Sequence, residues 1–136
     1  KAVDDGIPFL GLCLGIQVIL EESEESPGVP GLGLLSGTCK RFPQEMKVPH
    51  MGWNTLEKKN KIPLLEGIET GSYFYFVHSY YPIPADAAYT ACETNYGNIT
   101  FPSVISKDNI HATQFHPERS GEKGLKLLEN FLNLTR

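Results

Sequence analysis

The chain has 136 residues, of which 40% are hydrophobic and 21% charged, and its formal net charge is −4. This size predicts one domain, residues 1–136, with its own hydrophobic core, and the acidic balance argues against a nucleic-acid partner. We expect no membrane association, because no apolar run has the length of a span or the pattern of a signal peptide. Three cysteines without a CxxC pair favour reduced thiols and a cytoplasmic location.

The first predicted element is Ile7–Leu12, a short apolar run after a glycine, which is typical of a parallel strand covered on both faces. A buried helix is predicted next, over Leu14–Ser23. The glutamates that follow read as the solvated end of that helix: Glu21, Glu22, Glu24 and Glu25. Prolines and glycines then predict a long loop over Pro27–Gly37.

Cys13 lies between Gly11 and Gly15, at the predicted change from strand to helix. In a G-x-nucleophile-x-G turn the two glycines make room for a sharp backbone reversal and for substrate. The thiol would then stand exposed at a helix N-terminus, which favours the thiolate, and the backbone N–H of Leu14 would face an oxyanion. The alternative is a small buried cysteine in a glycine-rich turn.

The rest of the chain predicts a region rich in strands and a closing helix. The predicted strands are Thr38–Phe42, Asn54–Glu57, Ser72–Val77, Ala88–Asn95, Asn98–Phe101, Val104–Lys107 and Ile110–Phe115. An amphipathic helix is predicted over Gly121–Leu134, with one apolar face made of Leu125, Leu128, Phe131 and Leu132. Together these elements indicate a mixed α/β domain.

His116-Pro117-Glu118 follows the last predicted strand and supplies a base for the cysteine. Pro117 favours an extended His116, and residues two apart in extended chain point to the same side. His116 would therefore carry protons while Glu118 fixes its tautomer, as in a nucleophile, base and orienter triad. Alone, the tripeptide is more typical of a surface turn; with the cysteine elbow it indicates catalysis.

The remaining cysteines and histidines give weaker signals. Cys39 and Cys92 fall within predicted strands, which suggests buried packing. His111 and His116 would face opposite ways in a strand, so we expect no metal site. His78 ends an aromatic strand, and the loop after it, Ser79 to Tyr81, is a candidate ligand-binding position; a hydrogen-bonded strand-end histidine is the alternative.

Several segments together resemble the class I glutamine amidotransferases. GLCLGIQ (Gly11–Gln17), FVHSYY (Phe76–Tyr81) and HATQFHPERSG (His111–Gly121) stand in that family's order and at its spacings. Two more, Pro30–Leu35 and Val48–Asn54, resemble the glutaminase subunits of imidazole glycerol phosphate synthases, which act in histidine biosynthesis. The resemblance implies a flavodoxin-like mixed α/β sheet with flanking helices.

The resemblance also implies roles for the site residues. Cys13 would attack the side-chain amide of L-glutamine and form a glutamyl thioester, with His116 moving protons and Glu118 orienting it. Residues that would hold the α-amino and α-carboxylate groups of glutamine are Gln17, Ser79 and Tyr80, beside the oxyanion donor Leu14. No cofactor and no metal is implied.

A partner is implied as well. The ammonia would pass to a cyclase subunit with a (β/α)₈ barrel, in a heterodimer, and react there with a phosphoribulosyl aminoimidazole-carboxamide to give imidazole glycerol phosphate and AICAR. Residues expected toward that partner are Met51, Trp53, Asn54 and His78. Separate sites make chemical sense, because ammonia released into neutral water becomes ammonium and is no longer a nucleophile.

One departure from the family pattern concerns the start of the chain. The family has a βαβ segment upstream of the elbow, with a glycine-rich loop that gives a second oxyanion donor, whereas here Lys1 comes shortly before the nucleophile strand. We therefore expect either an N-terminally truncated domain or a sheet that lacks the strands needed to cover Phe9 and Leu10. Two alternatives remain: a stand-alone cysteine hydrolase, such as a peptidase or γ-glutamyl hydrolase, and a non-catalytic interaction domain of the same fold.

Overall fold

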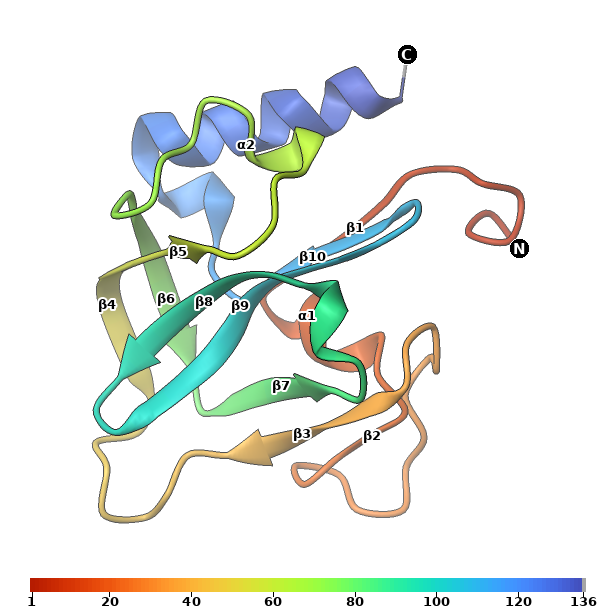
Figure 1. The fold of residues 1–136 in the computed structure, drawn as a ribbon. Coiled ribbons are helices and arrows are strands. Elements are labelled where there is room, and N and C mark those ends of the chain that lie inside the picture. The colour runs from red at the N-terminus through yellow and green to blue at the C-terminus, as the bar shows by residue number, and fades with distance from the viewer. Residues whose placement is uncertain (136) are drawn as a thin grey trace.

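The structure is a computed structural model that describes residues 1–135 as a mixed α/β fold (Figure 1). The strands are β1 (Phe9–Leu12), β2 (Glu22–Ser23), β3 (Gly37–Arg41), β4 (His50–Thr55), β5 (Glu57–Lys58), β6 (Tyr73–His78), β7 (Tyr80–Pro84), β8 (Thr90–Tyr96), β9 (Ile99–Lys107) and β10 (Ile110–Thr113). The helices are α1 (Leu14–Val18) and α2 (Gly121–Leu134), with 3-10 turns at Pro63–Leu65, Ala87–Tyr89 and Pro117–Arg119. Within residues 1–135, no helix combines the length and apolar character needed to cross a bilayer.

The largest sheet has the order β1-β10-β9-β8-β5, and smaller sheets have the orders β2-β3-β7 and β4-β6. β1 runs parallel to β10, with Leu12 opposite Thr113, so the carboxyl ends of the two strands lie together. β1 is an edge strand, and Gly11 is its one buried residue. Among the described strands only β10 pairs with it, but both of its faces meet the core, because Leu10 packs against one cluster of buried residues and Phe9 against the other.

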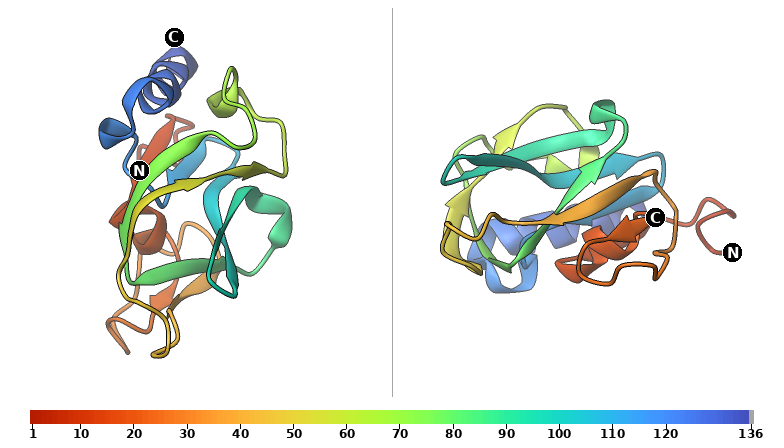
Figure 2. Two further views of the ribbon diagram at one scale, coloured as in Figure 1. Left: turned by 90° about the vertical axis from the view of Figure 1, so that its left-hand side faces the viewer. Right: turned by 90° about the horizontal axis from the view of Figure 1, so that it is seen from below.

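The core consists of two clusters of buried side chains, the larger of which contains several phenylalanines. Phe74, Phe76, Phe101 and Phe115 are fully buried in one cluster, which also receives Leu127 of α2. A second cluster surrounds Ile16 and Ile19 beside α1. Seen from below, both helices lie on the same side of the strands (Figure 2).

The first helix is much shorter than predicted, since it ends at Val18 and not at Ser23. The loop that follows folds back, and its N–H groups take the carbonyls that a longer helix would use: Leu32 N–H donates to the Val18 carbonyl at 2.7 Å and Leu34 N–H to the Ile19 carbonyl at 2.8 Å. Glu22–Ser23 instead pairs with β3 as a short parallel strand. The glutamate run is thus not a helix end.

Two further predictions about strands are corrected. The segment after His78 was expected as a loop but forms β7, whose Pro82 and Pro84 are tolerated because β7 lies at a sheet edge. The separate strands predicted on either side of Ser103 are one continuous strand, β9. Their apolar residues read as two runs because Pro102 interrupts them.

The closing helix has the predicted bounds, but its buried face is different. Leu125 and Leu132 are 63% and 57% exposed, whereas Gly124, Leu127 and Asn130 are buried. Asn130 turns inward because its amide donates to the Leu64 and Glu66 carbonyls at 2.9 and 2.8 Å. The buried face of the helix therefore includes a polar residue beside Gly124 and Leu127.

Candidate active site

The predicted turn at the cysteine, from a strand into a helix, is confirmed, although the helix is shorter than predicted. Cys13 lies between β1 and α1 with φ 53° and ψ −101°, a backbone conformation that non-glycine residues rarely adopt. Its N–H donates to the Thr113 carbonyl at 2.8 Å, which ties the turn to β10. A Cβ on Gly11 would lie 2.8 Å from the Gly15 carbonyl oxygen, so the first glycine allows the chain to double back.

The Cys13 thiol is partly buried and contacts the Val77 carbonyl, 3.7 Å from Sγ. Burial raises the pKa of this thiol, the Leu14 N–H lowers it, and the negative charge of Glu118 raises it further. The expected preference for the thiolate is therefore outweighed in the resting state, and the thiol needs a base. Cys39 and Cys92 are fully buried, and burial raises the pKa of each to about 12.

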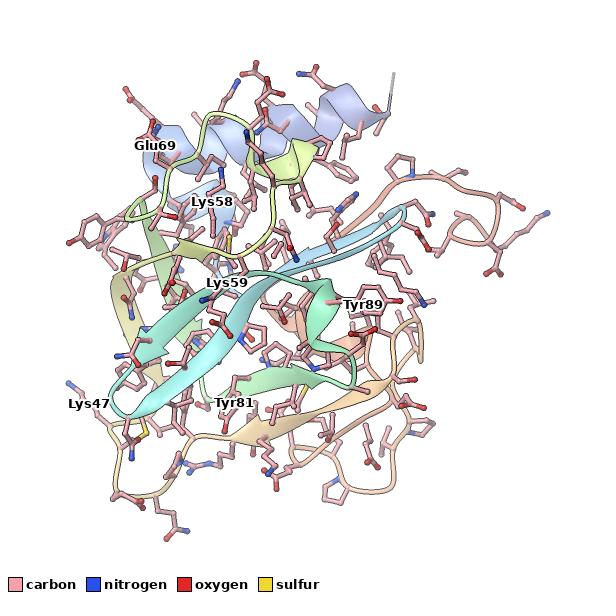
Figure 3. All side chains as sticks on the ribbon, viewed as in Figure 1. Lys47, Lys58, Lys59, Glu69, Tyr81 and Tyr89 are labelled. Carbon is pink, nitrogen blue, oxygen red and sulfur yellow. The ribbon has the colours of Figure 1, made fainter. Side chains whose placement is uncertain are left out.

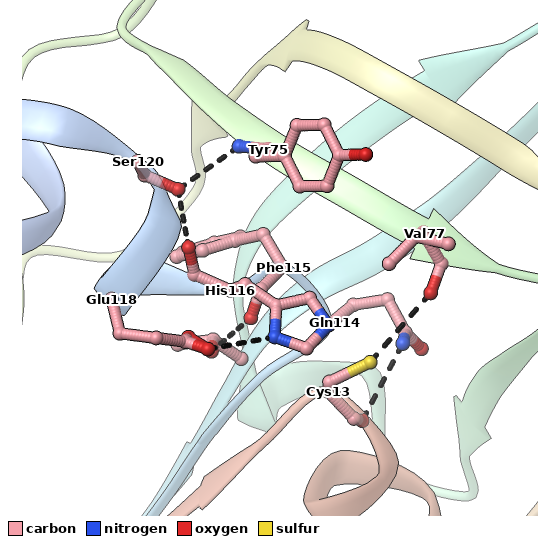
Figure 4. A network of polar contacts seen from close by, with 9 residues as sticks. Cys13, Tyr75, Val77, Gln114, Phe115, His116, Glu118 and Ser120 are labelled. Atoms are coloured by element: carbon pink, nitrogen blue, oxygen red, sulfur yellow. Dashed lines mark hydrogen bonds and ion pairs between the residues drawn. The ribbon is translucent and has the colours of Figure 1, made fainter.

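His116 and Glu118 form the expected pair. The His116 Nδ1–H donates to the Glu118 carboxylate at 2.9 Å, and the two side chains are 22% and 46% exposed. The His116 backbone is extended, and its N–H donates to the Tyr75 carbonyl at 2.9 Å. Ser120 braces the turn, since its hydroxyl donates to the His116 carbonyl and accepts from Tyr75 N–H (Figure 4).

The fold brings this pair to the cysteine. Cys13 directly follows β1 and His116 follows the neighbouring parallel strand β10, so both lie at the carboxyl ends of paired strands. Because Glu118 Oε2 occupies Nδ1, the other ring nitrogen of His116 is left for chemistry, and it points toward Cys13 in the view of Figure 4. The row of thiol, imidazole and carboxylate suits nucleophilic catalysis.

A cavity of about 160 Å³ opens beside the thiol, which suits a small ligand such as one amino acid. Its walls are Cys13, Leu14, Gln17, Glu25, Val77, His78, Ser79 and Tyr80. All four residues predicted to bind substrate are among them. Glu25 is an addition that sequence reasoning missed, because four glutamates in five positions carry no signal that separates one from the others.

Gln17 is held firmly in the cavity wall. Both protons of its side-chain amide are engaged, one by the Tyr80 carbonyl at 3.0 Å and one by the Gln114 side-chain oxygen at 3.1 Å. Gln114 in turn donates to the Cys13 carbonyl at 3.4 Å. A ligand that contacts the Gln17 amide therefore meets its oxygen, an acceptor.

The residues predicted to face a partner divide into two sets. Met51 and Trp53 are 62% and 56% exposed on β4, and the Trp53 ring packs edge-on against Tyr75. His78 is only 6% exposed, so its predicted place on a partner surface is wrong for the side chain. Asn54 points with His50 to the other side of β4, because side chains alternate along a strand, and its amide donates to the Asn95 carbonyl.

Larger hollows exist elsewhere but hold no such chemistry. Volumes of about 450 and 460 Å³ lie along the segment 58–70, which includes Lys58, Lys59 and Glu69 (Figure 3). Lys59 is paired there with Glu57 and Glu93. Within residues 1–135 no group of three His, Cys, Asp or Glu side chains has the arrangement of a metal site.

Comparison with known proteins agrees with the geometry. The sequence profile of glutamine amidotransferase class-I matches residues 1–134. Proteins named imidazole glycerol phosphate synthase subunit HisH are 54% identical in Methanocaldococcus jannaschii, 51% in Thermococcus kodakarensis and 56% in Methanothermobacter thermautotrophicus. These matches cover 98%, 98% and 97% of the chain, which spans 67%, 69% and 65% of the relatives' lengths.

Solved structures share the fold. A Thermoplasma acidophilum protein described as part of a GMP synthase has a TM-score of 0.70 at 20% identity, over 98% of this chain and 60% of that protein. A structure described as a glutamine amidotransferase has a TM-score of 0.68 at 22% identity, over 99% and 65% of the two chains. The mixed α/β architecture is thus that of these proteins.

Proposed function

The chain belongs to the class I glutamine amidotransferases, and from this membership we propose that it is the glutaminase subunit of an imidazole glycerol phosphate synthase, hydrolysing L-glutamine to glutamate and ammonia. One observation carries the proposal. The Cys13 elbow lies beside the hydrogen-bonded His116–Glu118 pair, at a cavity of the size of one amino acid.

The reaction begins with the thiol. His116 accepts the proton of Cys13, and the sulfur attacks the side-chain amide carbon of glutamine. The Leu14 N–H, which already faces the sulfur, stabilises the oxyanion of the tetrahedral intermediate. The C–N bond then breaks, the proton passes from His116 to the departing nitrogen, and ammonia leaves a glutamyl thioester. Water activated by His116 hydrolyses this thioester to glutamate and restores the thiol.

Glu118 orients the base. Its carboxylate accepts the Nδ1–H of His116, which fixes the tautomer with a free second nitrogen and stabilises the imidazolium that forms when the thiol proton arrives. Glu118 does not itself carry the proton.

The cavity wall provides complementary groups for the amino-acid end of glutamine. Glu25, a carboxylate, and the side-chain oxygen of Gln17 are acceptors that suit the α-ammonium group. Ser79 and Tyr80, where β6 passes into β7, hold the α-carboxylate. This division gives selectivity for a free amino acid over an amide inside a peptide.

The ammonia is consumed by a cyclase subunit with a (β/α)₈ barrel, which forms imidazole glycerol phosphate and AICAR. The exposed Met51 and Trp53 on β4 supply an apolar contact for that partner, since aromatic side chains dominate many interfaces. The proposed location is the cytoplasm, where thiols are kept reduced.

The test measures glutamate release by the purified protein on its own, with the cyclase, and with cyclase plus an analogue of the cyclase substrate. We expect glutamate release to rise at each step and to be abolished in Cys13→Ser. Equal rates in all three conditions would indicate a stand-alone hydrolase. Absence of glutamate in every condition would indicate a non-catalytic domain.

A further inference from the structure

Two buried histidines take no part in the chemistry above. His50 on β4 and His78 at the end of β6 are directly opposite each other in the antiparallel pair, and they are 4% and 6% exposed. The Nδ1 of His50 and the Nε2 of His78 are 2.9 Å apart, so one ring donates to the other. Their contact needs an explanation, because two charged imidazoles could not face each other in this way.

The neighbours of the two rings determine which nitrogen carries each proton. The Tyr80 carbonyl, 2.8 Å from His78 Nδ1, can only accept, so His78 donates there and accepts at Nε2. His50 must then donate from Nδ1, and its own Nε2 accepts from the Asn54 side-chain amide at 3.2 Å. Both rings therefore make their hydrogen bonds as neutral imidazoles. Each group donates to the next one along, from Asn54 through His50 and His78 to the Tyr80 carbonyl.

The surroundings keep this chain of hydrogen bonds dry. The His50 ring stacks on Tyr96 and Phe76, with ring centroids 4.1 and 5.0 Å away, and the His78 ring packs against Phe42 and Phe101. Tyr96 is the titratable group among these, and its hydroxyl donates to the Lys47 carbonyl. Burial lowers the pKa of His50 to about 4 and that of His78 to about 3.

The chain of hydrogen bonds ends at the cavity. The Tyr80 carbonyl that accepts from His78 also accepts from the Gln17 amide, and both residues line the cavity beside Cys13. One carbonyl oxygen is therefore fixed jointly by the buried histidines and by a cavity-wall residue. Loss of the His78 donor would leave this carbonyl with one fewer hydrogen bond, and the Gln17 amide with a less firmly oriented acceptor.

We infer that His50 and His78 are positioning residues for glutamine binding: as a neutral pair they hold the Tyr80 carbonyl, and through it Gln17, in the arrangement that receives the amino-acid end of the substrate. This inference rests on the proposed glutaminase function. The pair therefore contributes to the affinity for glutamine and takes no part in the proton transfers at Cys13.

The test compares two variants of His78 in the complete synthase. His78→Phe keeps a ring in the aromatic cluster but removes the donor to Tyr80, and we expect KM for glutamine to rise about tenfold with kcat within about threefold. His78→Asn restores a donor at the position of Nδ1, so KM should return to within about threefold of wild type. A purely structural role would move kcat and KM together and would not be rescued by asparagine.

His111 provides the matched control. It is equally buried and hydrogen-bonded, to the Ser106 hydroxyl at 2.9 Å, but does not line the cavity. His111→Phe should leave KM unchanged. Labelling adds a second measurement: a diazoketone analogue of glutamine should modify Cys13 more slowly in His78→Phe, whereas iodoacetamide, which lacks the amino-acid end, should react as in wild type.

A measurement on the wild-type protein covers the case in which His78→Phe does not fold. Nitrogen-15 NMR at neutral pH should show both rings neutral, with the proton on Nδ1 of each, and glutamate should shift the His78 signal and not the His111 signal. A charged ring, or an unchanged KM in His78→Phe, would overturn the inference. Wild-type protein that releases no glutamate and resists the diazoketone would instead overturn the proposed function.

Discussion

The His116–Glu118 pair and the His50–His78 pair show how its surroundings give the same side chain two different roles. His116 is partly open to solvent and faces the carboxylate of Glu118, so its ring can gain and lose a proton during a reaction. His50 and His78 face each other among aromatic rings, where burial keeps both neutral. An imidazole next to a carboxylate is suited to carrying protons, and one enclosed by rings is suited to holding another group in place.

The largest effect expected from this contrast concerns turnover. His116→Ala should lower kcat for glutamine hydrolysis by at least about 10⁴-fold, because the thiol loses its base, whereas His78→Asn should change kcat by less than about threefold. Steady-state glutamate release by the complete synthase measures both. Similar losses in the two variants would erase the proposed division of roles.

Next in size is the loss of the group that holds each histidine. Glu118→Ala should lower kcat by about 10²–10³-fold, less than His116→Ala, because the partly exposed ring keeps its basic nitrogen and water replaces part of the carboxylate contact. Asn54→Ala removes the corresponding neighbour of His50 and should raise KM by a few fold. An unaffected rate in Glu118→Ala would make the His-Pro-Glu segment an ordinary surface turn.

The same distinction between an open site and a closed interior applies to the thiols. Cys13 should react with the diazoketone analogue at least about 100-fold faster than Cys39 or Cys92, whose burial raises the pKa of each to about 12. Peptide mass mapping of the native protein after brief exposure gives the three rates. Comparable labelling of all three would remove the assignment of Cys13 as nucleophile.

The two faces of β4 offer a smaller contrast. Trp53 is exposed and His50, on the opposite face, is buried, so Trp53→Ala should weaken cyclase binding by about tenfold and leave Cys13 reactive in the isolated protein. Titration of the labelled protein with cyclase gives the dissociation constants. If Trp53→Ala bound the cyclase with unchanged affinity, the partner surface would have to lie elsewhere than on β4.

The smallest expected effect is on stability. The pKa values of about 4 and 3 for His50 and His78 lie below the ordinary value of 6.5, so the unfolded chain binds more protons between pH 6.5 and 4, and stability falls as pH falls through that range. His78→Phe removes one of these groups and should reduce the slope by at most about 1.4 kcal/mol per pH unit. Urea unfolding at several pH values measures how the free energy of unfolding changes with pH in the wild type and in His78→Phe. Equal slopes in the two proteins would show that His78 is charged in the folded state and would contradict this prediction.

Local chemistry explains which parts of the site were predictable from sequence. Cys13 between two glycines and His116 two residues before Glu118 are short-range patterns, and their geometry is set by backbone conformation within a few residues. The closing helix was predictable to its ends for the same reason. Its packing face was not, because Asn130 satisfies carbonyls of a segment more than 60 residues earlier.

The unpredicted features depend on long-range pairing. His50 and His78 are 28 residues apart, and only the register of β4 against β6 makes them partners. The early end of α1 depends on carbonyls taken by the following loop, whose prolines and glycines predict a loop but not this pairing. Glu25 reaches the cavity for the same reason, since the chain after α1 turns back beside Cys13 instead of extending the helix.

The backbone angle of Cys13 has a consequence for evolution. Glycine would adopt φ 53° and ψ −101° without the strain that a side chain brings, roughly 1–3 kcal/mol, so selection for a stable fold alone would favour replacement of this cysteine. In a lineage that no longer used the reaction, we expect this cysteine to be replaced early, for example by glycine, which adopts the same backbone conformation without strain. A cysteine is therefore expected to persist at this turn only where its thiol is used.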